Sequence, residues 1–227
     1  MKKAIFGLFC ISVITFSCKK SDPDPVAPAD KPYMNLTDGT RWTYRVVTDS
    51  GLATQTAVID TVIVNGDTTV NSKPYKILVH SNGNLHSYYN NTGNDYYQFQ
   101  KVVAAGAEIE QLYLKDNLAV GGTWFQDINL VIPGVPPAPD TNVPIRLTYT
   151  ITDKGISKTE YGVTYPDVIG VKTDISSTLL PGGSIVSDIK SYYARNVGLI
   201  EGNYNIEVAV AGIAIHTNNF IQSADLH

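Results

Sequence analysis

Cysteine, charge and long apolar runs are all scarce in this chain. Only Cys10 and Cys18 occur among 227 residues, which excludes a scaffold held together by several disulfides. Charged residues make up 17% of the chain and the formal net charge is −4, so a general nucleic-acid binder with a basic surface is excluded. The hydrophobic share of 43% is nevertheless large enough for a folded core and argues against a disordered chain.

The chain also lacks the short motifs that mark common enzyme and cofactor sites. It contains no Walker A loop, no Rossmann glycine fingerprint and no HExxH, GxSxG or EF-hand pattern. Its carboxylates form no pair that indicates general acid and base catalysis. We therefore predict that the protein is not an enzyme and that it needs no cofactor.

Two histidines have a spacing that raises the question of a metal site. His80 and His86 flank a turn at Asn82–Asn84, and with a three-residue loop they would face each other across a hairpin as two metal ligands. A two-residue turn shifts the pairing by one residue and removes that arrangement. Lys76 has the same strand parity as His80, which favours a solvated polar face, so we predict no metal site.

The longest uncharged run near the start of the chain is Ala4–Phe16, which follows two lysines. A helix that crosses a membrane needs about 20 apolar residues, so this run is too short and fits the apolar region of a secretory signal peptide. The run is followed by Ser17 and Cys18, which resemble the lipobox of bacterial lipoproteins, where the cysteine is lipidated. We predict a signal peptide at residues 1–17 and lipidation of Cys18. An ordinary signal peptide cleaved nearby is the alternative, because the two residues before Ser17 depart from the lipobox pattern.

Residues 18–32 combine the predicted lipidated cysteine with a tether that contains four prolines. Proline blocks helix formation and sheet pairing, so the tether is expected to be extended and semi-rigid. Its opening, Cys18-Lys19-Lys20-Ser21-Asp22-Pro23-Asp24, is similar to the start of many Bacteroidota envelope lipoproteins. The resemblance implies a lipid-anchored protein of the outer membrane, on its periplasmic or cell-surface face, with the membrane as a partner.

Residues 33–227 are predicted to form one antiparallel β domain, because apolar and polar residues alternate with a period of two. The ranges predicted as strands are Thr40–Val47, Ala57–Val64, Tyr75–His80, Ala104–Asp116, Arg146–Thr152, Ile189–Tyr193 and Asn205–Val210. Tight hairpin turns are predicted at Asn65-Gly66-Asp67, Asn82-Gly83-Asn84 and Asn91-Thr92-Gly93-Asn94, and an exposed loop at Pro133–Pro144. The predicted fold class is all-β, as a single curved antiparallel sheet or half-barrel.

The chain contains signs of a faint internal repeat. Gly39-Thr40-Arg41-Trp42 matches Gly122-Thr123-Trp124, Tyr75 matches Tyr165, and Ser87-Tyr88-Tyr89 matches Ser191-Tyr192-Tyr193. The spacings differ between the matches. Chance is the alternative explanation in a chain with 14 tyrosines.

One series of motifs resembles the motifs of a group of envelope lipoproteins described as TapB-like. These proteins are frequent in Bacteroidota and have no assigned chemistry. The series runs from Gly39-x-x-Trp42-x-Tyr44 through Asp167-Val168-Ile169-x-Val171 to the stretch YYARNVGLIE at Tyr192–Glu201. The resemblance covers about Leu36 to Val210. It implies a single curved antiparallel β domain and carries over no catalytic residue.

Tyrosine is the remaining residue type that indicates a binding site. The candidate ligand-binding residues are three adjacent pairs: Tyr88, Tyr89, Tyr96, Tyr97, Tyr192 and Tyr193. Adjacent strand residues point to opposite faces, so one tyrosine of each pair is expected inside and the other more exposed. An exposed phenol offers an apolar ring and a hydroxyl to a ligand, whereas the alternative is that these rings only stabilise the sheet.

We therefore predict a membrane-anchored lipoprotein of the cell envelope that acts as a non-enzymatic binding module. Its ligand would be a hydrophobic molecule, a glycan or a peptide. The alternative is a structural or interaction protein of an envelope complex with no small-molecule site, which could pair a sheet edge with a partner strand.

Overall fold

The computed structural model describes residues 31–49, 55–83, 85–102, 107–132, 141–179, 185–208 and 213–227. The predicted signal peptide at 1–17, Cys18 and most of the 18–32 tether lie outside these residues. All regular elements in the described residues are β-strands. No helix in this part of the chain has the length and apolar character needed to cross a membrane.

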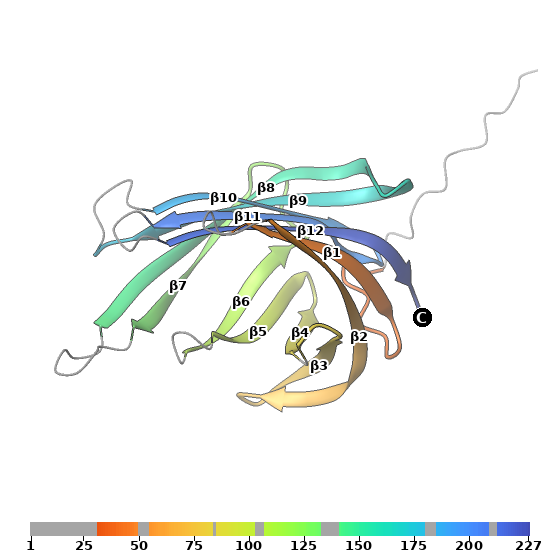
Figure 1. Cartoon of the computed structure of the whole chain (residues 1–227), viewed down its shortest axis with the longest axis horizontal. Coiled ribbons are helices and arrows are strands. Elements are labelled where there is room, and N and C mark those ends of the chain that lie inside the picture. The colour runs from red at the N-terminus through yellow and green to blue at the C-terminus, as the bar shows by residue number, and fades with distance from the viewer. Residues whose placement is uncertain are drawn as a thin grey trace, which may run out of the picture.

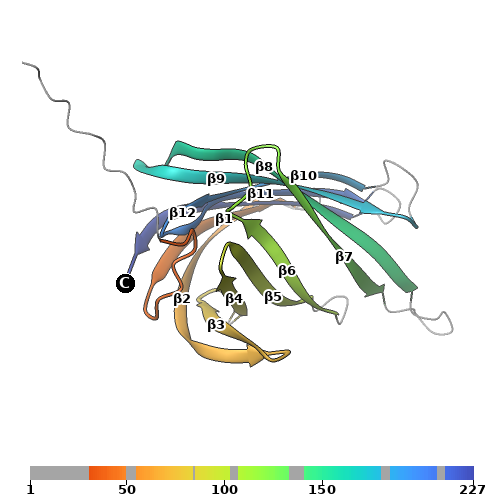
Figure 2. The ribbon, with the colours of Figure 1, turned by 180° about the vertical axis from the view of Figure 1, so that it is seen from behind.

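The twelve strands form one antiparallel sheet, which confirms the all-β prediction. They are β1 (Arg41–Asp49), β2 (Thr56–Val70), β3 (Lys73–His80), β4 (His86–Thr92), β5 (Asp95–Val102), β6 (Ala107–Lys115), β7 (Thr123–Ile132), β8 (Thr141–Glu160), β9 (Val163–Ser177), β10 (Ile185–Ala194), β11 (Gly198–Val208) and β12 (Ile213–Asp225). Their order across the sheet is β6-β5-β4-β3-β2-β1-β12-β11-β10-β9-β8-β7, so β1 pairs with β12 and β6 and β7 are the edges. The sheet curls into a nearly closed, barrel-like curve (Figures 1 and 2).

The period-2 alternation of the sequence sets which side chains face the interior. In β1, Trp42 is fully buried and lies on the inner face with Tyr44 and Val46, as their shared parity predicts. In β8, Leu147 and Tyr149 are buried on the same inner face. The core residues therefore lie on the inner face of the curled sheet.

The predicted hairpin turn at Asn65-Gly66-Asp67 is wrong. These residues lie within β2, where the register with β3 shifts between Val64 and Asp67, and Gly66 has a φ of +88°. A glycine with positive φ inside a strand is typical of a β-bulge, which bends and twists the strand. The hairpin turn instead lies at Asn71 and Ser72, both with positive φ.

The predicted exposed loop at Pro133–Pro144 is wrong in part. Thr141–Pro144 form the start of β8 and pair with β7, and Pro144 lies opposite Asn129. Because β7 is the edge of the sheet, proline near the edge is tolerated there. Residues 133–140 lie outside the described part of the chain.

The weak internal repeat maps onto two halves of six strands each. Trp42 and Trp124 are each the second residue of the first strand of a half, β1 and β7. Tyr75 and Tyr165 are each the third residue of the third strand of a half, β3 and β9. The third match does not follow this pattern, because Ser87 is the second residue of β4 and Ser191 is the seventh residue of β10. The strand positions therefore do not decide between duplication and chance.

The N-terminal segment of the domain packs across one end of the curled sheet. The Tyr33 amide donates to the Tyr96 hydroxyl at 3.0 Å, and Met34 bridges to Val197. The Trp42 Nε1 donates to the Val197 carbonyl at 2.8 Å. We call this the closed end, because buried side chains fill it.

An ion pair fixes the same segment from outside. The Arg195 Nε donates to Asp167 at 2.6 Å, and the Tyr33 hydroxyl donates to the other oxygen of that carboxylate at 2.7 Å. The Arg195 guanidinium also lies 4.3 Å from the centre of the Tyr33 ring and donates to the Lys31 carbonyl at 2.7 Å. The point where the tether enters the domain is thus bound tightly to the closed end.

Side chains of β7 bridge the gap between the two sheet edges. The Trp124 Nε1 donates to the Leu112 carbonyl of β6 at 2.9 Å. The Gln126 Oε1 accepts from the Leu112 amide at 3.1 Å, while its Nε2 donates to the Glu110 carbonyl. These bonds take the place of a backbone ladder between β6 and β7, and we call them the seam.

Candidate functional site

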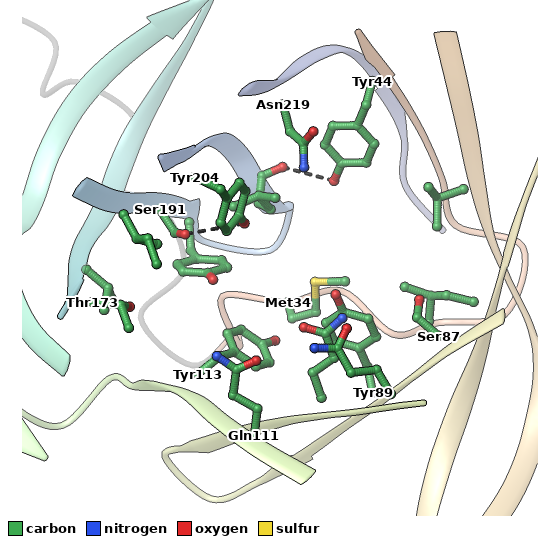
Figure 3. Close-up of a pocket in the computed structure, with 18 of the residues that line it drawn as sticks. Met34, Tyr44, Ser87, Tyr89, Gln111, Tyr113, Thr173, Ser191, Tyr204 and Asn219 are labelled. Carbon is green, nitrogen blue, oxygen red and sulfur yellow. Dashed lines mark hydrogen bonds between the residues drawn. The ribbon is translucent and has the colours of Figure 1, made fainter. Parts of the chain in front are cut away.

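The curled sheet encloses a cavity of about 870 Å³ (Figure 3). Its walls come from both halves of the molecule and combine apolar side chains with phenols, hydroxyls and carboxamides. The cavity reaches the surface beside the β3–β4 connection, where the lining residue Leu85 is 63% exposed. This opening lies at the strand ends opposite the closed end.

Apolar side chains are exposed around the same strand ends. Besides Leu85, these residues include Val58 at the start of β2 and Ile215 at the start of β12, whose strand partners Val46 and Ile206 line the cavity. We call these three residues the rim. A rim of this kind suits the passage of an apolar molecule between solvent and the cavity.

Two polar atoms of the cavity wall are buried without a hydrogen-bond partner. They are the Tyr113 hydroxyl and the Asn219 Oδ1. Tyr113 is 5% exposed, and its ring packs between those of Tyr89 and Tyr193, with centroid distances of 5.7 and 5.3 Å. Buried polar groups are nearly always hydrogen-bonded, so these two atoms are exceptions within the cavity wall.

Other polar groups of the wall are held in place by partners. The Tyr44 hydroxyl donates to the Leu199 carbonyl at 3.0 Å. Ser191 lies 3.5 Å from the Tyr204 hydroxyl (Figure 3) and also hydrogen-bonds to Tyr193. These hydrogen bonds fix the orientation of the tyrosine side chains in the cavity wall.

Burial keeps the phenols of the cavity neutral. Desolvation raises the pKa of Tyr44, Tyr89 and Tyr113 well above the ordinary value, and the pKa of Tyr193 rises for the same reason. Among the described residues, none of those that line the wall is a lysine or an arginine. The described lining therefore presents neutral hydrogen-bonding groups rather than positive charge.

Asp60 is the carboxylate among the described lining residues, and it belongs to a cluster near the opening. His80 Nδ1 lies 2.7 Å from an oxygen of Asp60, and His80 Nε2 lies 2.9 Å from the Ser87 hydroxyl. Asp60 and Ser87 are both 8% exposed. The three residues come from β2, β3 and β4, and all of them line the cavity.

This cluster corrects the expectation that His80 belongs to a solvated polar face. His80 has the same parity as Leu78, which is 2% exposed and lines the cavity. The hairpin register places Val79 opposite His86, so His80 and His86 do not face each other. The described residues contain no group of three or more histidine, cysteine, aspartate or glutamate side chains placed to hold a metal ion.

The structure separates the six tyrosines of the sequence prediction. Tyr89 and Tyr193 line the cavity, and Tyr88 borders it while its ring lies 6.1 Å from Phe99. Tyr96 is buried in the closed end, where its hydroxyl donates to Asp116 at 2.7 Å.

Tyr97 and Tyr192 are not among the residues that line the cavity. The ammonium of Lys73 lies 5.2 Å from the Tyr97 ring centre, and that of Lys158 lies 4.3 Å from the Tyr192 ring centre. Tyr192 and Tyr193 thus follow the parity rule for adjacent strand residues.

Four further tyrosines line the cavity that the sequence analysis did not single out: Tyr44, Tyr113, Tyr149 and Tyr204. A signal existed for three of them, because Tyr44 shares its parity with Trp42, Tyr149 with Leu147, and Tyr204 with Ile206. No comparable apolar alternation marks Tyr113.

Comparisons with known proteins identify no family. No family model matches the chain, and no curated protein gives a significant match. A solved structure described as a candidate lipoprotein from Parabacteroides distasonis aligns with a TM-score of 0.47 and 10% identity, covering 86% of this chain and 99% of that one. A candidate exported protein with a YmcC-like fold from Bacteroides fragilis aligns with a TM-score of 0.41 and 8% identity over the same shares. Neither likeness extends to a function, and the TapB-like resemblance stays a prediction.

Proposed function

We propose that the protein binds a neutral, largely apolar molecule inside the curled sheet and presents this site from a lipid anchor at Cys18 in the cell envelope. The observation that carries the proposal is the cavity of about 870 Å³ with two unpartnered polar atoms, the Tyr113 hydroxyl and the Asn219 Oδ1. Cavities of roughly 300–1,000 Å³ are typical of small-molecule sites. The role of the site is binding, as the sequence analysis expects.

The chemistry of the walls selects the kind of ligand. Apolar side chains such as Leu147, Val171 and Ile189 line the cavity and suit an aliphatic or aromatic body. Tyr113 and Asn219 suit one or two hydroxyl or carbonyl groups on that body. An anionic ligand would find no lysine or arginine among the described lining residues, and burying it unpaired is costly. The apolar part of the wall leads us to favour the hydrophobic class over glycans and peptides.

The point where the tether joins the domain supports an open site. The tether enters at the closed end, where Arg195 and Asp167 hold Tyr33. The cavity opens at the opposite strand ends. A lipid at Cys18 would therefore leave the rim directed away from the membrane that holds the anchor.

The alternative, an interaction protein that pairs a sheet edge with a partner strand, finds less support. The free edges are β6 and β7, and the seam occupies part of the β6 edge. Trp124 and Gln126 already bond the Leu112 amide and carbonyl. A partner strand would have to displace these bonds.

The proposal is tested by titration with N-phenyl-1-naphthylamine, a neutral apolar dye that fluoresces on leaving water. The full chain should bind the dye saturably. Thr173→Trp places an indole on the cavity wall and should weaken binding at least about tenfold, because it fills space that the dye needs.

The matched control is Thr150→Trp, one residue from Tyr149 on the outward-facing side of β8, opposite Lys172. It adds the same indole outside the cavity and should leave the affinity unchanged. Absence of saturable binding by the unmodified chain, or equal weakening by both substitutions, would contradict the proposal.

A further inference from the structure

We propose that Asp60, His80 and Ser87 form a nucleophilic triad that cleaves a carboxylic ester bound in the cavity. The inference rests on the proposed function, because it takes the bound neutral molecule to be the substrate, and it departs from the sequence prediction that the protein is not an enzyme.

The geometry meets the requirement for an activated serine. A nucleophile and its base lie about 2.6–3.2 Å apart in such sites, with a third group that orients the base. Ser87 Oγ lies 2.9 Å from His80 Nε2, and Asp60 Oδ2 lies 2.7 Å from His80 Nδ1. The arrangement joins three neighbouring strands of the curved sheet.

The surroundings of Asp60 determine the tautomer of the histidine. The other carboxylate oxygen, Oδ1, accepts from the Asn82 amide at 3.1 Å and from the Ser81 hydroxyl at 3.3 Å. A carboxylate only accepts hydrogen bonds, so His80 must carry its proton on Nδ1. Nε2 is then free to accept the proton of the Ser87 hydroxyl.

The cavity brings a substrate to this serine. Ser87 lines the wall and pairs across the hairpin with Leu78, which provides an apolar surface beside it. Gln98 and Gln100 of the next strand also line the cavity, and their carboxamides are candidate donors to an oxyanion. An ester with an apolar acyl chain suits this combination.

The reaction balances with water as the second reactant. The Ser87 oxygen bonds to the ester carbonyl carbon while its proton passes to His80 Nε2. The tetrahedral intermediate collapses, and the alcohol leaves with that proton, so Ser87 is acylated. Water then gives a proton to His80 and its oxygen to the acyl group, and the acid leaves as the proton returns to Ser87.

The same hydrogen bonds would also stabilise the β3–β4 connection if the cluster had only a structural role. Asp60 holds Ser81 and Asn82, and this would be sufficient to retain the carboxylate. A structural cluster would leave the Ser87 hydroxyl as unreactive as any other serine. Reactivity of Ser87 therefore separates the two roles.

The test is labelling of the full chain with a fluorophosphonate that carries a decyl chain, followed by intact mass measurement and peptide mapping. We expect one adduct on Ser87 and none in Ser87→Ala. His80→Gln can still bond to Asp60 and should slow labelling at least about 100-fold, since general-base catalysis contributes on the order of 10²–10⁴. Ser176→Ala, at an exposed serine of β9, should label like the unmodified chain.

Circular dichroism and dye binding are measured on each variant, so that loss of the fold or of the cavity is seen separately. No adduct on a folded chain that binds the dye, or labelling that His80→Gln leaves unchanged, would overturn the triad and leave the proposed binding function standing. Loss of dye binding by the unmodified chain would overturn both.

Discussion

Tyr113 is the residue whose environment is hardest to explain by stability alone. Its hydroxyl is buried without a partner, although its ring makes edge or tilted contacts with three other tyrosines, the third being Tyr96 at 6.3 Å. A phenylalanine would keep these ring contacts and bury no unpaired hydroxyl. Retaining the hydroxyl is consistent with a role in holding a ligand.

Tyr113→Phe should therefore stabilise the empty protein and weaken ligand binding. We expect the free energy of unfolding in urea to rise by about 1 kcal/mol, because an unpaired buried hydroxyl costs roughly 1–3 kcal/mol. Tyr149→Phe is the matched control, since the Tyr149 hydroxyl accepts from Gln111 Nε2 at 2.9 Å. That substitution should lower the free energy of unfolding by about 1 kcal/mol. Equal destabilisation by both would mean that the Tyr113 hydroxyl has a partner in solution.

At the scale of elements, the seam decides whether the sheet stays curled. β6 and β7 are the two edges of the sheet, and side chains rather than a backbone ladder connect them. Gln126 alone satisfies the Leu112 amide and the Glu110 carbonyl. Opening the seam would expose the cavity along its length.

Gln126→Leu should loosen the seam while keeping the side-chain volume similar. We expect the free energy of unfolding to fall by about 1–3 kcal/mol, because a backbone amide and a carbonyl lose their partner. Hydrogen exchange should become faster at the amides of β6. Asp127→Asn, on the same strand as Gln126, removes an exposed ion pair with Arg146 of β8 and should change the free energy of unfolding little. Unchanged exchange in β6 after Gln126→Leu would show that the seam does not hold the edge.

The sequence predicted most of the strands because each has a local period of two. Thr40–Val47, Arg146–Thr152 and Ile189–Tyr193 fall almost entirely within β1, β8 and β10, and Ala104–Asp116 contains β6. The error at Asn65-Gly66-Asp67 has a physical reason, since asparagine and glycine suit a bulge as well as a hairpin turn. Local residue preferences do not distinguish the two.

The site could be predicted only in part, because it depends on register. Tyr89 and Tyr193 were in the predicted set, as parity places one member of each pair inside. Asp60, His80 and Ser87 come from three strands, and only the pairing of Leu78 with Ser87 and of Val62 with His80 brings them together. The residue types along a sequence do not reveal such a pairing, and a shift by one residue would separate the three side chains.

At the scale of the whole molecule, the buried phenols link folding to alkaline pH. Desolvation raises the pKa of Tyr44, Tyr113 and Tyr204, and it raises that of Tyr149 to about 12. In the unfolded chain these phenols have their ordinary pKa of about 10. Above that pH the unfolded state loses protons that the folded state keeps, so stability falls as pH rises.

We therefore expect that ionisation of the phenols leaves the free energy of unfolding unchanged below about pH 9. Above about pH 10 the free energy of unfolding should fall steeply. Phenolate absorbance at high pH should rise together with the loss of the β-sheet signal in circular dichroism. If most phenols instead titrated near their ordinary pKa while the sheet signal persisted, the phenols would be in contact with water and the cavity would be open to solvent throughout.

The described residues place the start of the domain and the opening at opposite ends of the curled sheet. Tyr33 and Arg195 bind the segment that follows the tether to the closed end, and the rim lies at the other strand ends. Figure 2 shows the curled sheet between these two ends. The cavity between them is the feature on which the account depends.

The most direct test of that cavity is a crystal structure of the protein with a neutral long-chain alcohol that carries bromine at its far end. The account predicts anomalous bromine signal inside the curled sheet, with the alcohol oxygen within hydrogen-bond distance of the Tyr113 hydroxyl or the Asn219 Oδ1. Bromine signal confined to the outer surface, with ordered water alone between Tyr113 and Asn219, would contradict it.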